Sequence, residues 1–283
     1  YRLPETIPLQ ENWNTAVSLC RGEWIHLLHH DDYVLPEFYA RLKAGLATSP
    51  KSVGAAFTGY ENINEERQII FSQQHNLGNH RGVVADWILR VGVFCPLSPP
   101  SLVIRRAAYE KLGGYKLDLL YTCDWEFYKR VATFYDWWYE PGILAHYREQ
   151  ANSITIAENL RGASGYDHLR AIEISESYLP AKDCAKITAE SRIHHFWWCL
   201  TQANRPLKSG NLDGTLQLLQ AALKIDRSPE AIAQLSLWLQ EKPAVPLVKY
   251  LAQLEIDSED VEQNILLNLA RTIFYNREED FLS

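Results

Sequence analysis

The stretch EWIHLLHHDD, residues 23–32, joins a mostly apolar run to two adjacent aspartates. Its apolar part is typical of a β-strand that is covered on both faces. Because ligands of open α/β sheets bind outside the carboxyl ends of the strands, Asp31 and Asp32 would border such a crevice. Paired carboxylates suit Mg²⁺ or Mn²⁺, since both ions prefer oxygen ligands. The alternative is that Asp32 caps the helix beginning near Pro36 while Asp31 is solvated.

The three histidines of this stretch invite comparison with a zinc site. On a strand, His26 and His30 would share one face while His29 points to the other, so the three would not converge. We therefore favour a polar strand end in which one histidine forms a hydrogen bond with a carboxylate.

Strand and helix patterns alternate around this stretch as far as about residue 158. The expected strands are short apolar or alternating runs, and they cover residues 53–60, 68–72 and 101–106, with two further runs in 137–148. The expected helices have apolar residues at helical spacing, and they cover residues 11–22, 36–47, 84–91, 107–114 and 124–134. This alternation predicts an α/β domain over residues 1–158.

From about residue 159 to residue 283, helical periodicity replaces the strand patterns. Within this tail, residues 203–229 have the Gly and Ala placement of a tetratricopeptide-like helix pair. Because such repeats need neighbours to bury their faces, a single pair favours a helical appendage over a repeat array. We expect an all-α tail that offers a surface to a protein partner.

The composition is that of a folded, acidic protein. Of the 283 residues, 47% are hydrophobic, which is ample for a packed core, and the net charge of −7 argues against a sequence-independent nucleic-acid binder. The five cysteines are scattered without a C-x-x-C pair, which favours free thiols in a reducing cytoplasm. No apolar run reaches the roughly 18 residues that a membrane span needs. We expect a cytoplasmic protein, and peripheral contact with the inner face of the membrane stays open.

A second acidic cluster lies in YTCDWEFYKR, residues 121–130. Asp124 and Glu126 are at the expected start of a helix, where the helix dipole favours a carboxylate and keeps its pKa low. A carboxylate there can act as a general base if it lies within hydrogen-bond reach of an acceptor hydroxyl. The alternative is a helix cap at Asp124 and a surface carboxylate at Glu126. Trp125 belongs either to the core or to a sugar-binding face.

The order of four stretches resembles the family 2 glycosyltransferases. These stretches are residues 12–39, 99–115, 123–132 and 144–155, and together they span more than half of the chain. The resemblance implies a GT-A nucleotide-diphospho-sugar fold, with a Rossmann-like mixed sheet flanked by helices. It also implies inverting transfer of a sugar, assisted by Mg²⁺ or Mn²⁺, from a nucleotide-diphosphate sugar to a hydroxyl of a glycan or lipid-linked acceptor. The family begins with strands that hold the nucleotide base. Nothing of that kind precedes Tyr1 and the chain has no Met, so we expect its first part to be missing here.

The resemblance also implies roles for single residues. The metal motif of the family, Leu-Asp-x-Asp-Asp, falls on Leu28 to Asp32, which makes Asp31 a metal ligand and Asp32 its support or a substrate contact. His29 occupies the position of the first Asp of the motif, and we keep it as a second candidate ligand. Asp124 matches the catalytic base, which deprotonates the acceptor hydroxyl.

Trp125, Glu126 and Arg148 are the further candidates for binding substrate. Arg148 would clamp phosphate, and it begins a stretch that in this family usually reads Arg-x-His-x-x-Ser. Here Gln150 stands at the histidine position, and His146 is a candidate to replace it.

Two other classes of function stay open. One is a non-catalytic, degenerate glycosyltransferase-like scaffold whose working surface is the helical tail; the departures at His29 and Gln150 are compatible with it. The other is a metal phosphohydrolase built on His30 and Asp31. It would need further His and Asp ligands on helices, so the strand-like context of residues 26–29 disfavours it.

Overall fold

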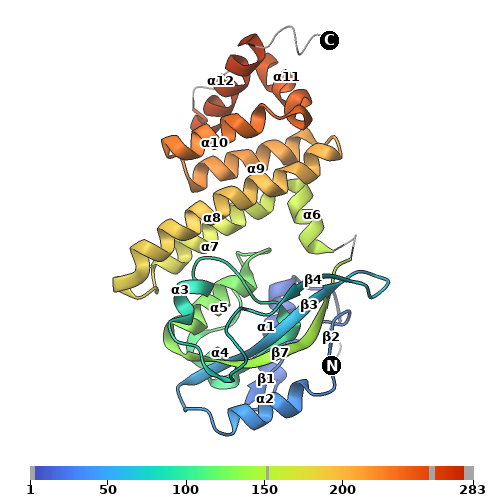
Figure 1. Cartoon of the computed structure of the whole chain (residues 1–283), viewed down its shortest axis with the longest axis vertical. Helices are drawn as coiled ribbons and strands as arrows, with labels where there is room; N and C mark the ends of the chain where they lie inside the picture. The colour runs from blue at the N-terminus through green and yellow to red at the C-terminus, as the bar shows by residue number, and fades with distance from the viewer. Residues whose placement is uncertain (1–3, 151–152, 255–258, 277–283) are drawn as a thin grey trace. The chain divides into compact units, whose positions relative to one another are not determined.

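The computed structural model describes residues 4–150, 153–254 and 259–276. The chain forms two compact units (Figure 1). The first, called the sheet unit, contains Tyr1–Ser153 and Ala171–Thr188, and the second, called the helical unit, contains Ile154–Arg170 and Ala189–Ser283. The expected boundary near residue 158 therefore lies inside the helical unit. Residues 171–188 return to the sheet unit because apolar side chains among them pack into its core.

A mixed sheet forms the centre of the sheet unit, with seven strands among the described residues (Figure 1). Its two long strands, β3 (Val53–Ile63) and β7 (Asp136–Arg148), run parallel and side by side. The other strands are antiparallel to their neighbours: β6 (Leu102–Arg105) on β3, β1 (Trp24–Ile25) on β6, β2 (Tyr33–Val34) on β7, β4 (Ile69–Gln73) on β3 and β5 (Gly82–Val83) on β7. The prediction of a mixed α/β sheet is confirmed.

Residues 26–32, called the crossing loop, connect the strands at opposite ends of the sheet order. They follow β1, which pairs with β6, and precede β2, which pairs with β7. The backbone leaves the sheet after Ile25 to reach β7, so the strand expected over residues 23–29 is only two residues long. Tyr33 pairs with His146, two residues before the end of β7. The crossing loop therefore arrives at the carboxyl ends of the parallel strands.

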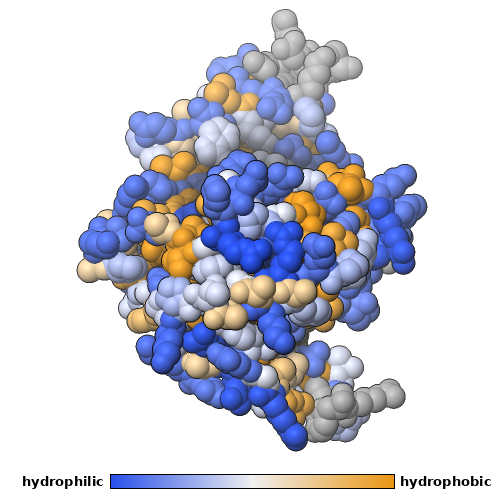
Figure 2. Space-filling model, turned by 60° about the horizontal axis from the view of Figure 1, so that its bottom comes forward, coloured by the Kyte–Doolittle hydropathy of each residue, from blue (hydrophilic) through white to orange (hydrophobic). Residues whose placement is uncertain are grey.

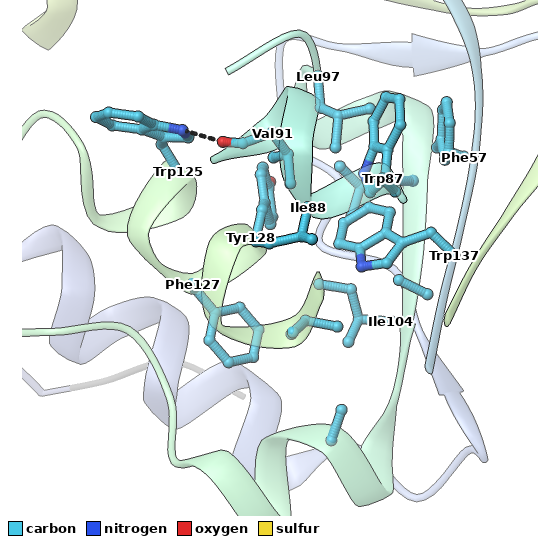
Figure 3. Close-up of a cluster of buried hydrophobic side chains, with 14 of the residues drawn as sticks. Phe57, Trp87, Ile88, Val91, Leu97, Ile104, Trp125, Phe127, Tyr128 and Trp137 are labelled. Atoms are coloured by element: carbon cyan, nitrogen blue, oxygen red, sulfur yellow. Dashed lines mark hydrogen bonds between the residues drawn. The ribbon is translucent and has the colours of Figure 1, made fainter. Parts of the chain in front are cut away.

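Helices cover both faces of the sheet, and the alternation of side chains along β7 decides which core each residue joins. Trp138 points to the face covered by α2 (Phe38–Leu46), where it packs with Phe38. Trp137 and Tyr139 point to the other face, which carries the larger core. In that core Phe57 of β3 stacks on Trp87, with ring centroids 4.5 Å apart (Figure 3). The helices that contribute to it include α1 (Leu9–Leu19), α3 (Trp87–Val91), α4 (Arg106–Leu112) and α5 (Cys123–Phe134).

β7 is one strand with an irregular register, where two short runs were expected. Thr58 pairs with Glu140 and Gly59 with Ile143, so Pro141 and Gly142 bulge out of the ladder. Gly142 has φ +99°, a backbone conformation that favours glycine. The bulge absorbs the Pro-Gly pair, and the strand then continues to Arg148 beside the end of β3.

The helical unit confirms the predicted all-α tail. Its described helices include α6 (Ile154–Arg161), α9 (Leu212–Ile225), α10 (Pro229–Leu239), η2 (Lys242–Ala244), α11 (Val245–Gln253) and α12 (Val261–Asn276), with parts of α7 (Ala163–Glu176) and α8 (Ala181–Lys208). The helix pair expected over residues 203–229 is present as the end of α8, α9 and the start of α10. Asn211 caps α9, because its side-chain oxygen accepts the Gly214 N–H at 2.9 Å. The tetratricopeptide assignment stays a prediction.

The surface bears on the question of membrane contact. In the part of the chain that the structure describes, no helix combines the length and apolarity needed to cross a membrane. On the face shown in Figure 2, apolar residues form separate patches among hydrophilic ones. Peripheral association with a membrane stays a prediction.

Candidate functional site

The crossing loop gathers three potential metal ligands. One ligand atom each from His29, Asp31 and Asp32 lies within 4.8 Å of the others. The three come together because the loop turns out of the sheet before it joins β2, and turn residues can present neighbouring side chains to one point. The expectation that His29 points away from its neighbours assumed a continuous strand, and the short β1 removes that assumption.

Asp32 is the most deeply buried member of the cluster, with 8% of its surface exposed. Its Oδ1 accepts the Arg148 backbone N–H at 2.9 Å. The other oxygen, Oδ2, is buried and has no hydrogen-bond partner among the described residues. Burial raises the pKa of Asp32 to about 7, and the nearby charge of Asp31 adds to this rise, while the Arg148 hydrogen bond opposes it. A buried oxygen without a donor is the arrangement that a bound cation would satisfy, so the cluster fits a divalent metal.

Asp31 is held by the end of β7. Its Oδ2 accepts a hydrogen bond from the Gln150 amide at 3.0 Å, and its backbone carbonyl accepts one from Arg148 Nε at 3.1 Å. The Arg148 guanidinium also donates to the carbonyls of Asn64 and Glu65, at 3.1 and 3.3 Å. Arg148 thus ties the crossing loop to the turn after β3. This contact set gives Arg148 a positioning role, and its contact with phosphate stays a prediction.

The His29 ring is fixed by its neighbours. It stacks on Trp13 of α1, with ring centroids 5.1 Å apart, and its Nδ1 is 3.6 Å from Asp32 Oδ2. Its Nε2 is buried, and no described residue offers it a hydrogen bond. Burial lowers the pKa of His29, which favours the neutral imidazole that binds metals.

The other histidines of the sequence motifs are outside the metal-ligand group. His30 Nδ1 lies 3.9 Å from Asp31 Oδ1, but the His30 side chain is 94% exposed. His26 is within hydrogen-bond distance of the Tyr39 hydroxyl and the Pro100 carbonyl, and burial lowers its pKa to about 4. His146 stacks on Tyr33 within the sheet. Gln150 thus donates the hydrogen bond to Asp31 Oδ2, and the sequence motif marked that position without revealing its partner.

Asp124 lies in the first turn of α5, outside the metal-ligand group. The helix begins at Cys123 with Thr122 as its N-cap, so Asp124 is inside the helix. Its Oδ1 accepts the N–H of Trp125 at 2.7 Å. Burial raises the pKa of Tyr60 on β3 and of Cys95, and the negative charge of Asp124 contributes to both shifts. The carboxylate is therefore close enough to β3 and to the loop after α3 to act on them electrostatically.

Trp125 and Glu126 build the core of the sheet unit. Trp125 is 2% exposed, and its indole N–H donates to the Val91 carbonyl at 2.7 Å (Figure 3). Glu126 is fully buried and accepts two hydrogen bonds from Arg130, at 2.9 and 2.8 Å. Both were candidates for substrate contact. In the structure both side chains contact protein partners, and their contact with substrate stays a prediction.

Glu126 supports the cluster through a chain of contacts. Arg130, which it binds, donates to the Gly114 carbonyl at 2.7 Å. The next residue, Tyr115, exchanges two hydrogen bonds with Asn14 of α1, at 2.9 and 2.7 Å. A Cβ at Gly114 would lie 2.0 Å from Asn14 Oδ1, so a larger residue here would displace the Asn14 side chain from Tyr115. The turn holds α1, which carries the Trp13 ring under His29.

Comparison with known proteins identifies the type of fold. No protein-family profile matches the chain, and no curated protein sequence matches it. Its fold is similar to that of the glycosyltransferase TarS from S. aureus: the structure of TarS 1-349 aligns with a TM-score of 0.57 and 13% identity over 96% of this chain and 72% of that one. A second TarS structure aligns with a TM-score of 0.52 and 13% identity over 95% of this chain and 41% of that one. The chain therefore has a glycosyltransferase-like fold.

Proposed function

We propose that the chain is a metal-assisted glycosyltransferase that moves a sugar, with inversion, from a nucleotide-diphosphate sugar to a hydroxyl group. The observation that carries the proposal is the unpaired, buried Oδ2 of Asp32 beside Asp31 and His29. This cluster lies at the carboxyl ends of two parallel strands, where open α/β sheets bind ligands. The glycosyltransferase-like fold supports the same conclusion, and the family 2 assignment is part of the proposal.

The crossing loop is the proposed donor site. Asp31, Asp32 and His29 would hold the divalent ion, while Arg148 and Gln150 keep the loop in place. When bound, such an ion neutralises the negative charge that gathers on the diphosphate leaving group. Carboxylates alone would repel the diphosphate, so the site depends on the ion to accept this substrate.

Asp124 is the proposed general base. Its carboxylate takes the proton of the acceptor hydroxyl as that oxygen attacks the anomeric carbon. The bond from the anomeric carbon to the diphosphate breaks on the opposite side, so the configuration inverts. The acceptor would be a glycan or a lipid-linked sugar, and the reaction would take place in the cytoplasm or at the inner face of the membrane.

The test compares three variants in a transfer assay with a panel of nucleotide-diphosphate sugars and glycan acceptors. We expect Asp124→Asn to abolish transfer while donor binding persists, because only the proton acceptor is lost. Asp32→Asn should abolish both transfer and the response to added metal. The control, Asp136→Asn, changes an exposed carboxylate at the start of β7 and should retain activity. Full transfer by the Asp124 variant would overturn the assignment of the base.

Two other functions predict different results. A non-catalytic scaffold would bind no nucleotide sugar and transfer nothing in any variant. A phosphohydrolase would release phosphate from nucleotides without an acceptor. The latter needs more ligands than His30 and Asp31, and within the described residues no further His, Cys, Asp or Glu joins the cluster of the crossing loop.

A further inference from the structure

The His29 side chain gives the cluster a nitrogen donor beside two carboxylates. Its Nδ1 faces Asp32 Oδ2 at 3.6 Å, and a ligand atom from Asp31 lies within the same 4.8 Å group. A separation of 3.6 Å is too long for a hydrogen bond. An ion bound at about 2.0–2.2 Å from each ligand would span such a gap with a small closing movement.

Two orphaned atoms show that the protein itself does not complete this cluster. Asp32 Oδ2 and His29 Nε2 are both buried, and neither has a hydrogen-bond partner in the described ranges. Asp32 is more than nine-tenths buried, and its unpaired oxygen points toward the imidazole. In the tautomer that carries its proton on Nε2, the Nδ1 lone pair faces Asp32 and can bind a ligand there.

The position of the His29 ring is set by residues outside the metal-ligand group. Trp13 stacks on the ring at 5.1 Å and also meets Tyr115 edge-on at 5.1 Å. Asn14 ties the same helix to Tyr115 through two hydrogen bonds. A ligand that is held by packing is preorganised, so its donor type contributes to the selectivity of the site.

We infer that His29 is a metal ligand and that the mixed nitrogen and oxygen site selects a first-row transition-metal ion such as Mn²⁺ or Co²⁺ over Mg²⁺. Carboxylate oxygens accept all of these ions, whereas an imidazole nitrogen favours the transition metals. Among them, affinity rises from Mn²⁺ to Co²⁺. The use of the ion in catalysis rests on the proposed function, but its binding does not require a sugar donor.

The test is direct metal binding by the purified, metal-free chain, followed by electron paramagnetic resonance of Mn²⁺ with Mg²⁺ as competitor. Electron spin-echo measurements on the bound Mn²⁺ should show coupling to an imidazole nitrogen. Two variants remove the donor: His29→Asp supplies a carboxylate, and His29→Phe keeps a ring on Trp13. In both, the nitrogen coupling should disappear and the preference for Mn²⁺ over Mg²⁺ should fall about tenfold or more.

His80→Asn is the matched control, because it changes an exposed histidine that is outside the cluster. It should keep both the nitrogen coupling and the metal preference of the unmodified chain. Thermal unfolding of each metal-free variant verifies that the sheet unit remains folded.

The outcomes separate this inference from the proposed function. Nitrogen coupling that depends on His29, in a protein that transfers no sugar, would support the metal site and reject the transferase. Transfer with Mg²⁺ and Mn²⁺ used equally, and no nitrogen coupling, would overturn the role of His29 while leaving the transferase intact. Absence of metal binding in the unmodified chain would overturn the inference as well.

Discussion

The crossing loop and the start of α5 each contain a buried carboxylate, but the two carboxylates differ in their hydrogen bonding. Glu126 is fully buried, and Arg130 binds both of its oxygens. Asp32 is also buried, yet its Oδ2 has no hydrogen-bond partner among the described residues. The difference teaches that burial alone does not mark a functional carboxylate. A paired carboxylate stabilises the fold, whereas an unpaired one has a cost that a ligand can offset.

Removing Glu126 should have the largest effect on stability. Glu126→Ala leaves the Arg130 guanidinium buried without its counter-charge, which should lower the free energy of unfolding by about 3–5 kcal/mol. Denaturant unfolding measures this change. Glu23→Ala is the control, because Glu23 is 70% exposed and meets Arg105 at 3.6 Å. An exposed pair of this kind contributes about 1 kcal/mol at most. Equal losses of unfolding free energy in the two variants would show that the buried Glu126–Arg130 pair contributes no more than an exposed ion pair.

Replacing Asp32 should raise the free energy of unfolding in the absence of metal, whereas replacing Glu126 lowers it. Asp32→Asn removes an unpaired buried charge, so the metal-free chain at pH 8 should gain about 1–3 kcal/mol. Added Mn²⁺ should stabilise the unmodified chain but not this variant. Thermal unfolding with and without Mn²⁺ measures both effects. Asp31→Asn should gain less, because Gln150 already donates to Asp31. A destabilised Asp32→Asn would show that Oδ2 has a structural partner after all.

Lys129 lies one turn after Trp125, and its titration should make the stability of the chain depend on pH. Burial lowers its pKa from 10.5 to about 7, although its Nζ donates to the Ala171 carbonyl at 2.8 Å and lies 3.8 Å above the Trp125 ring. Between these pKa values the unfolded chain binds more protons than the folded one. Stability therefore rises with pH from about 7 to 10, by about 1.4 kcal/mol per pH unit at most.

Lys129→Met keeps an apolar side chain of similar length and removes this titration. Its free energy of unfolding should lack that rise over the same pH range, as measured by denaturant unfolding at several pH values. Lys116→Met changes an exposed lysine and should keep the slope of the unmodified chain. If the Lys129 variant retains the full slope, the rise has another origin.

Gln150→Ala should change stability least and function noticeably. The hydrogen bond from the Gln150 side-chain amide to Asp31 is partly exposed. Its loss should change the free energy of unfolding by about 0.5 kcal/mol or less. It orients a proposed metal ligand, and we expect Mn²⁺ affinity to fall about tenfold. Isothermal titration calorimetry measures the affinity, with Gln217→Ala on the exposed side of α9 as the control. Unchanged affinity would exclude Gln150 from positioning the site.

The local patterns of the sequence predicted a large part of this organisation. Periodicity identified β3, β4, β6 and most helices of the sheet unit, and it distinguished the helical tail. The apolar run before Asp31 and Asp32 indicated that both would lie at the edge of a sheet. These predictions succeed because strand and helix patterns depend on neighbours within a few residues along the chain.

The partners of each side chain were decided only by the tertiary structure. Asp32 meets Arg148 and Asp31 meets Gln150 across more than a hundred residues. His29 turns toward Asp32 because the chain must cross the sheet to pair with β7, a demand that no local pattern contains. Sequence by itself thus determined which residue types stand at the carboxyl ends of the strands. The fold decided which of them remain unpaired, since pairing depends on contacts between segments that are distant along the chain.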